Sequence, residues 1–181
     1  MALIDYVDLD DAEGRVAMLL AADAETFGRP SLFARMLANE PSILEARARY
    51  VTKLRETGIL DKRERELIYV VVSLAHDCEY CAVSHTRRLV EEVGMPQDRV
   101  DAIADGDRSS LSERERTILR FAERAATDPK QISDADVEAL NDIGFDDADL
   151  VALTAVTATA VAATTIMDTL NIHPDDGVVL E

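Results

Sequence analysis

The chain has 181 residues, of which 48% are hydrophobic and only 7 are glycine and 5 proline. This composition is typical of one compact domain and excludes a disordered or low-complexity chain. Nineteen basic residues stand against 36 acidic ones, which gives a net charge of −17. Such a charge repels the phosphates of nucleic acids and the anionic lipids of membrane surfaces, so we expect neither as a partner.

Helical patterning runs along the whole sequence, and the alternation typical of strands is nearly absent. Glycine followed by an apolar residue indicates helix ends at Gly58, Gly94 and Gly144. Asp or Ser residues at suitable N-cap positions indicate where helices begin. We therefore predict an all-α chain of about eight or nine helices, near residues 11–27, 31–39, 42–57, 61–75, 77–93, 97–104, 112–127, 133–143 and 147–171.

The expected organisation is an N-terminal helical extension over residues 1–40, a main helical domain over 41–173 and a short tail over 174–181. The N-terminus has neither a basic region nor a long apolar stretch, so we expect no signal peptide and a cytoplasmic protein. Residues 150–167 carry no charge over 18 positions, which is near the lower limit for spanning a membrane. They are rich in Ala and Thr and are flanked by Asp, so we predict a buried helix, in the core or at the seam of an oligomer.

A short internal repeat singles out one acidic residue. The segment that begins at Leu60 recurs 51 residues later at Leu111, with a leucine, a capping residue and a charged first turn in each copy. The copies differ at Glu66, whose counterpart is Thr117, and helix capping requires no acid there. Because the helix after Glu66 is apolar nearly all round, desolvation would raise the pKa of a buried carboxyl and make it a general acid or base. The alternative is an exposed first-turn Glu that favours the helix dipole.

Both cysteines lie in one motif, Cys78-Glu-Tyr-Cys81-Ala-Val-Ser-His85. On a helix, Cys78, Cys81 and His85 share a stripe about 60° wide. With Asp77 as the N-cap, Cys78 would lie in the first turn, where free amides and the helix dipole favour a thiolate. His85, one turn beyond Cys81, is placed to take its proton, and the other thiol to convert a sulfenic acid into a disulfide.

Two other interpretations of this motif stay open. The two thiols and the imidazole of His85 would hold zinc if His76 completed a four-ligand site. Alternatively, the cysteines are buried core residues of a redox-sensing or purely structural helical oligomer, whose dithiol rarely turns over.

The spacing Glu66-x11-Cys78-x2-Cys81-x3-His85 resembles the carboxymuconolactone decarboxylase-like superfamily, and within it the alkyl hydroperoxidase D (AhpD) and peroxidase-related branch. The resemblance extends from about Pro41 to the end of the last predicted helix. It implies an all-helical domain that forms homo-oligomeric trimers or hexamers and acts as a thiol peroxidase or disulfide oxidoreductase. It further implies a peroxide substrate, a cellular dithiol or disulfide reductant protein as partner, and no metal or organic cofactor.

The resemblance also implies a role for each site residue. Cys81 would be the peroxidatic thiol that passes through a sulfenic acid, and Cys78 its disulfide partner and proton donor. Glu66 and His85 would form the proton relay. Tyr80 stands where AhpD has a histidine, and a phenol with a pKa of about 10 does not shuttle protons at neutral pH, although it can form hydrogen bonds. The peroxidase-related relatives are thus the closer likeness, and the cysteine pair argues against the decarboxylase activity, which does not depend on it.

Overall fold

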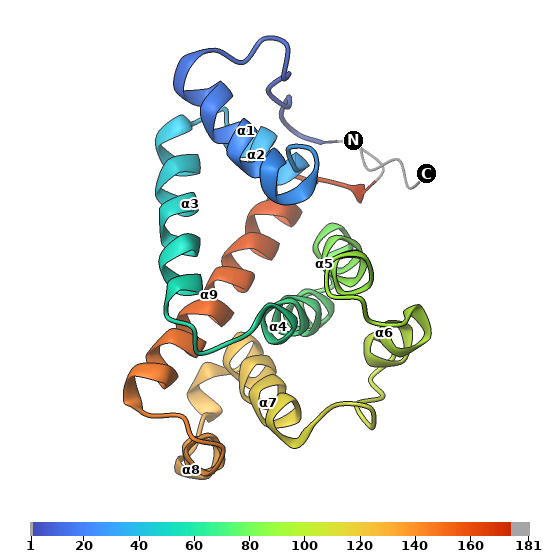
Figure 1. Ribbon diagram of the computed structural model, residues 1–181, viewed down its shortest axis with the longest axis vertical. Coiled ribbons are helices and arrows are strands. Elements are labelled where there is room, and N and C mark those ends of the chain that lie inside the picture. Colours follow the sequence, from blue (N-terminus) through green and yellow to red (C-terminus); the bar gives the residue numbers. More distant parts are fainter. Residues whose placement is uncertain (1, 175–181) are drawn as a thin grey trace.

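The computed structural model describes residues 2–174 and is all-helical over that range, as predicted (Figure 1). The predicted tail lies outside these residues except for Pro174, and the division at residue 40 stays a prediction. In chain order the elements are α1 (Gly14–Phe27), α2 (Leu32–Leu37), α3 (Pro41–Glu56), α4 (Lys62–Ala75), α5 (Glu79–Glu91), α6 (Gln97–Ala104), α7 (Glu113–Thr127), a short 3-10 helix (Pro129–Gln131), α8 (Asp134–Asp142) and α9 (Asp147–Thr169).

Capping residues set the ends of the central helices, and one cap differs from the prediction. Asp61 caps α4, and its side chain accepts a hydrogen bond from the backbone N–H of Glu64. Asp77, however, does not begin α5: it has a left-handed φ of 55°, and Cys78 is the N-cap. The Cys78 N–H donates to the Ser73 carbonyl at 2.9 Å, which is the Schellman arrangement at the end of α4. Asp77 therefore ends one helix instead of starting the next.

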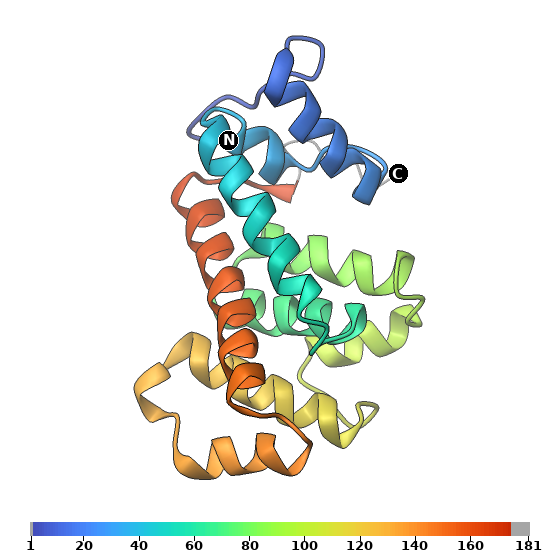
Figure 2. The same ribbon diagram turned by 60° about the vertical axis from the view of Figure 1, so that its left-hand side comes forward.

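Helix α4 lies at the centre of the molecule and contacts α5, α6, α7 and α9. Figures 1 and 2 show α3 and α9 running side by side, with α1 and α2 at one end of the molecule and α8 at the other. The main core forms around α4, whose Leu67, Ile68 and Val70 are completely buried. Burial on nearly all sides explains why this helix is apolar all round.

A second core joins the N-terminal helices to the cysteine motif. Leu20 of α1 and Leu32 of α2 belong to the same buried cluster as Cys78, Cys81 and other residues at the start of α5. Backbone hydrogen bonds fix the chain before α1, and in one of them the Leu3 N–H donates to the Leu170 carbonyl at 2.9 Å. Residues of the N-terminal helices therefore pack around the cysteines.

Helix α9 is, by length and composition, the one described helix that is long and apolar enough to cross a membrane. Half of its apolar window is buried inside the described part of the chain, where Leu153, Val156 and Ala160 pack into the main core. The rest faces outward and includes Val151, which is 71% exposed. The inner face behaves as the buried helix expected from the sequence.

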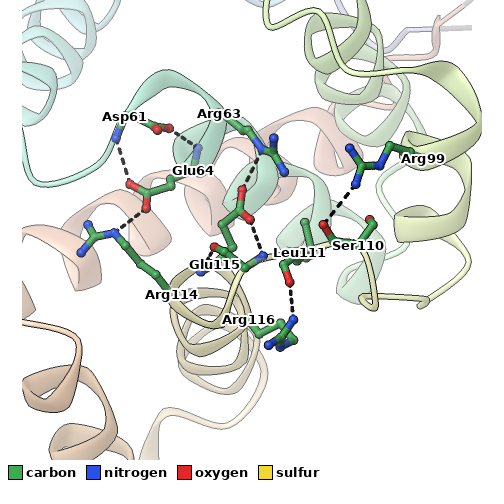
Figure 3. Close-up of polar contacts among 10 residues, drawn as sticks. Asp61, Arg63, Glu64, Arg99, Ser110, Leu111, Arg114, Glu115 and Arg116 are labelled. Atoms are coloured by element: carbon green, nitrogen blue, oxygen red, sulfur yellow. Dashed lines mark hydrogen bonds and ion pairs between the residues drawn. The ribbon is translucent and has the colours of Figure 1, made fainter.

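The internal repeat appears in the structure as two helix starts that pair reciprocally (Figure 3). Arg63 of α4 lies 2.7 Å from Glu115 of α7, and Arg114 of α7 donates to Glu64 of α4 at 2.6 Å. Both glutamates are buried and also close the capping box of their own helix. The repeated charged turns thus bind the starts of α4 and α7 together.

Candidate active site

Helices α4 and α5 bring Glu66 and His85 into direct contact. The Nδ1 atom of His85 lies 2.6 Å from Oε2 of Glu66, and the two side chains are only 12% and 9% exposed. Glu66 stands one turn into α4, at the position where the repeated segment in α7 has Thr117. The acid that the second copy replaces with Thr117 is therefore the one that contacts the imidazole of His85.

The pair holds a carboxylate and a neutral imidazole at neutral pH. Burial alone would raise the pKa of Glu66, but the charge and hydrogen bond of His85 outweigh it and hold this pKa below its ordinary value. The expectation that burial raises the pKa of Glu66 above its ordinary value is therefore wrong. Burial lowers the pKa of His85, and Glu66 opposes this only in part. Because a carboxylate only accepts hydrogen bonds, Nδ1–H of His85 donates to Glu66, which leaves Nε2 as the basic nitrogen.

The two cysteines are free thiols in different surroundings. Cys81, in the first turn of α5, is 4% exposed and lines a cavity, whereas Cys78 is completely buried. A hydrogen bond with Cys81, burial and a hydrogen bond with Asp168 raise the pKa of Cys78 far above its ordinary value. The predicted preference of Cys78 for the thiolate is therefore wrong, because this thiol is buried and hydrogen-bonded in its protonated form.

A cavity of about 260 Å³ opens above Cys81 between α1, α2, α3, α4 and α5. His85 and Glu66 line it, and so does Tyr69, whose ring stacks on the imidazole with centroids 4.4 Å apart and an interplanar angle of 9°. Tyr80 also lines the cavity, and burial raises the pKa of its phenol to about 12. Tyr80 therefore stays protonated at neutral pH and is restricted to hydrogen bonding and packing.

Sequence reasoning missed several residues of this cavity, among them Arg88, Tyr69 and Arg47. Arg88 continues the stripe of the cysteine motif by one further turn, and Tyr69 follows Glu66 by one turn, so helical spacing carried a signal for both. Arg47 lies on α3, and no spacing relates it to the motif. Only the packing of α3 against the other helices brings it to the cavity.

Within residues 2–174, no group of three or more His, Cys, Asp and Glu side chains is arranged to hold a metal. His76, the ligand that the zinc interpretation needs, places Nε2 3.2 Å from the carbonyl of Ala126 in α7. His173 pairs with Glu79 at 3.0 Å. These contacts give the zinc interpretation no support.

Comparisons with known proteins show which proteins this architecture resembles. Residues 41–124 match the model of the carboxymuconolactone decarboxylase family. A solved structure from Ralstonia eutropha JMP134, described as an AhpD core of an uncharacterized peroxidase-related protein, superposes with a TM-score of 0.86 at 26% identity. The alignment covers 97% of this chain and 93% of that one. No curated protein sequence matches this chain.

Two further solved structures share the fold at lower identity. A peroxidase-related protein from Silicibacter sp. TM1040 has a TM-score of 0.82 at 23% identity, covering 95% of this chain and 91% of that one. The debrominase Bmp8 has a TM-score of 0.77 at 14% identity, with 92% and 88% covered. The helical fold is thus that of AhpD-like, peroxidase-related proteins. Residues 41–124 are thus similar to the carboxymuconolactone decarboxylase family, and the chain as a whole is similar to an AhpD-like, peroxidase-related structure.

Proposed function

We propose that this protein is a thiol-dependent peroxidase of the alkyl hydroperoxidase type, which reduces hydrogen peroxide or organic hydroperoxides without a metal or organic cofactor. The observation that carries the proposal is a cavity that combines the Cys81 thiol with the hydrogen-bonded pair of His85 and Glu66. A neutral imidazole held by a carboxylate is the arrangement that activates a nucleophile. The likeness to peroxidase-related proteins supports the same activity.

The reaction begins when His85 takes the proton of Cys81. The Cys81 thiolate attacks the terminal peroxide oxygen, the O–O bond breaks, and the leaving oxygen takes the proton from His85 to form an alcohol or water. Cys81 is now a sulfenic acid. The Cys78 thiol condenses with it, so that a disulfide forms and a water molecule leaves. A cellular dithiol or dithiol protein then supplies the two electrons that restore both thiols.

Thiol counting and intact mass test this scheme. Anaerobically reduced protein should lose both thiols with one equivalent of hydrogen peroxide, while its mass falls by about 2 Da and no oxygen is added. The variant Cys81→Ser should lose all peroxide turnover, whereas Cys78→Ser should retain a sulfenic acid on Cys81. Two thiols left untouched, or full turnover by Cys81→Ser, would refute the proposal.

The near-complete burial of both cysteines favours a second candidate, a redox-sensing helical oligomer. This candidate predicts that oxidant forms the disulfide, but that peroxide removal stays negligible with every dithiol reductant supplied. Steady-state turnover with a small dithiol separates the two functions. Under either function we propose a cytoplasmic homo-oligomer, with the exposed face of α9 as its seam.

A further inference from the structure

Positively charged side chains line the cavity at Cys81, although the net charge of the protein is −17. Its walls include four arginines and two acidic residues: Arg47, Arg55, Arg65, Arg88, Asp23 and Glu66. Both acids are engaged, since Glu66 holds His85 and Asp23 accepts a hydrogen bond from the backbone N–H of Ser31 at 2.7 Å. The cavity therefore favours a negatively charged ligand, against the charge of the molecule as a whole.

Arg47 is the arginine best placed to bind such a ligand. Its guanidinium carbon lies over the Phe33 ring, 4.4 Å from the centroid, and its side chain is partly buried. Within residues 2–174, no carboxylate lies within ion-pair distance of it. Burial lowers the pKa of Arg47. Arg47 and Cys81 line the same cavity, so this cation lies near the proposed nucleophile. A guanidinium supported by an aromatic ring keeps its planar donors available for a carboxylate.

The remaining lining suits a small organic group. Leu19, Leu37, Leu44 and Val51 supply apolar surface from α1, the end of α2 and α3. A volume of about 260 Å³ is close to the lower end of the range for ligand pockets, so the ligand must be compact. Phe33 belongs to α2, which precedes the segment that matches the family model. The N-terminal extension thus helps to build the binding site.

We propose that the preferred substrate is a compact organic hydroperoxide that carries a carboxylate, with Arg47 binding the carboxylate and the peroxide directed at Cys81. This inference rests on the proposed peroxidase function. The chemistry is unchanged: the O–O bond breaks, one oxygen passes to Cys81, and the product is the alcohol that retains the carboxylate. A cellular dithiol again supplies the two electrons.

A first experiment tests the anion site without relying on peroxide chemistry. In fully reduced protein, the alkylation rates of Cys81 by iodoacetate and by neutral iodoacetamide are compared by peptide mass spectrometry. We expect the iodoacetate-to-iodoacetamide ratio to exceed that of a free thiol by about tenfold, because a buried charge-assisted contact favours the anion. Arg47→Gln should remove most of this excess.

Arg49→Gln is the matched control, because Arg49 lies on the same helix but is exposed and pairs with Glu45 at 2.7 Å. This variant should keep the wild-type ratio. A ratio equal to that of a free thiol would overturn the proposal. A Cys81 that neither reagent reaches would overturn it as well, since the cavity would then admit no ligand of this size.

A second experiment compares turnover of cumene hydroperoxide with turnover of its para-carboxylated analogue. We expect kcat/KM to favour the carboxylated compound by about tenfold in the wild type and in Arg49→Gln, and not in Arg47→Gln. Equal turnover of both compounds would refute the substrate proposal and leave the peroxidase function intact. Anion-selective alkylation without turnover of either compound would refute the peroxidase function, and with it this substrate.

Discussion

At the scale of single residues, the contact between Glu66 and His85 fixes which imidazole nitrogen carries the proton. The hydrogen bond of 2.6 Å places that proton on Nδ1, so Nε2 is the nitrogen that would accept the proton of Cys81 under the proposed function. Burial lowers the pKa of His85, and the nearby carboxylate raises it in part. The imidazole is therefore neutral at pH 7, and Glu66 makes it a stronger base than burial alone would allow.

This balance predicts how activity depends on pH. In the wild type, the acidic limb of kcat/KM for hydrogen peroxide should lie below pH 6.5, the ordinary pKa of histidine, because burial depresses the pKa of His85. Glu66→Gln removes a group that raises this pKa, so the limb should move to still lower pH. The plateau rate should fall by about tenfold to a hundredfold, because the imidazole becomes a weaker and less well-oriented base.

Stopped-flow measurements of peroxide reduction between pH 4.5 and 8 would check this. Glu91→Gln is a suitable control, since Glu91 lies on α5 with His85 but is exposed and pairs with Arg87. Its profile should match the wild type. An acidic limb that moves upward in Glu66→Gln, or an unchanged plateau rate, would show that Glu66 does not tune His85.

At the scale of helices, the starts of α4 and α7 hold the core together through buried glutamates (Figure 3). Glu64 accepts from Arg114 Nε at 2.6 Å and from the Asp61 backbone N–H at 3.0 Å. Arg114 also donates to the Ile59 carbonyl at 2.8 Å. Removing the partner of such an enclosed carboxylate lowers the free energy of unfolding of the protein, because the charge is left in a poorly solvated place.

A double-mutant cycle would measure the coupling energy between Arg114 and Glu64. Arg114→Ala, Glu64→Ala and the double variant should give a coupling energy of about 1–2 kcal/mol in urea unfolding, since Arg114 is partly exposed and part of the interaction is screened. The exposed pair of Lys53 and Glu56 serves as the comparison and should give at most about 0.5 kcal/mol. Equal coupling in the two pairs would mean that burial at the helix starts adds nothing.

Local sequence signals predicted the helices well because caps and glycines act within one turn. They failed at Asp77, because an acid before a helix and an acid in the left-handed turn after one look alike in sequence. The mismatch between the repeated segments identified Glu66 as exceptional, and helical spacing placed His85 near the thiols. Arg47 and Phe33 were out of reach, because their position depends on how the N-terminal helices and α3 pack together.

At the scale of the whole molecule, the charge of −17 is the dominant electrostatic feature. Only three of the basic residues are lysine, Lys53, Lys62 and Lys130, and several arginines are held in pairs or in the cavity. The acidic side chains in excess therefore repel one another across the folded surface. Unfolding lets these charges move apart, so the repulsion lowers the free energy of unfolding when little salt is present to screen it.

We accordingly predict that the midpoint of thermal unfolding rises with sodium chloride. The Debye length falls from about 30 Å at 0.01 M to about 3 Å at 1 M, so the repulsion between surface acids is largely screened over this range. The midpoint should rise by about 5–10 °C, most steeply at low salt, where screening changes the range of the repulsion most. Sucrose of equal osmolality, which stabilises by exclusion from the surface without screening charge, is the control. A midpoint that responds equally to salt and sucrose would show that the folded state tolerates its charge through local pairing.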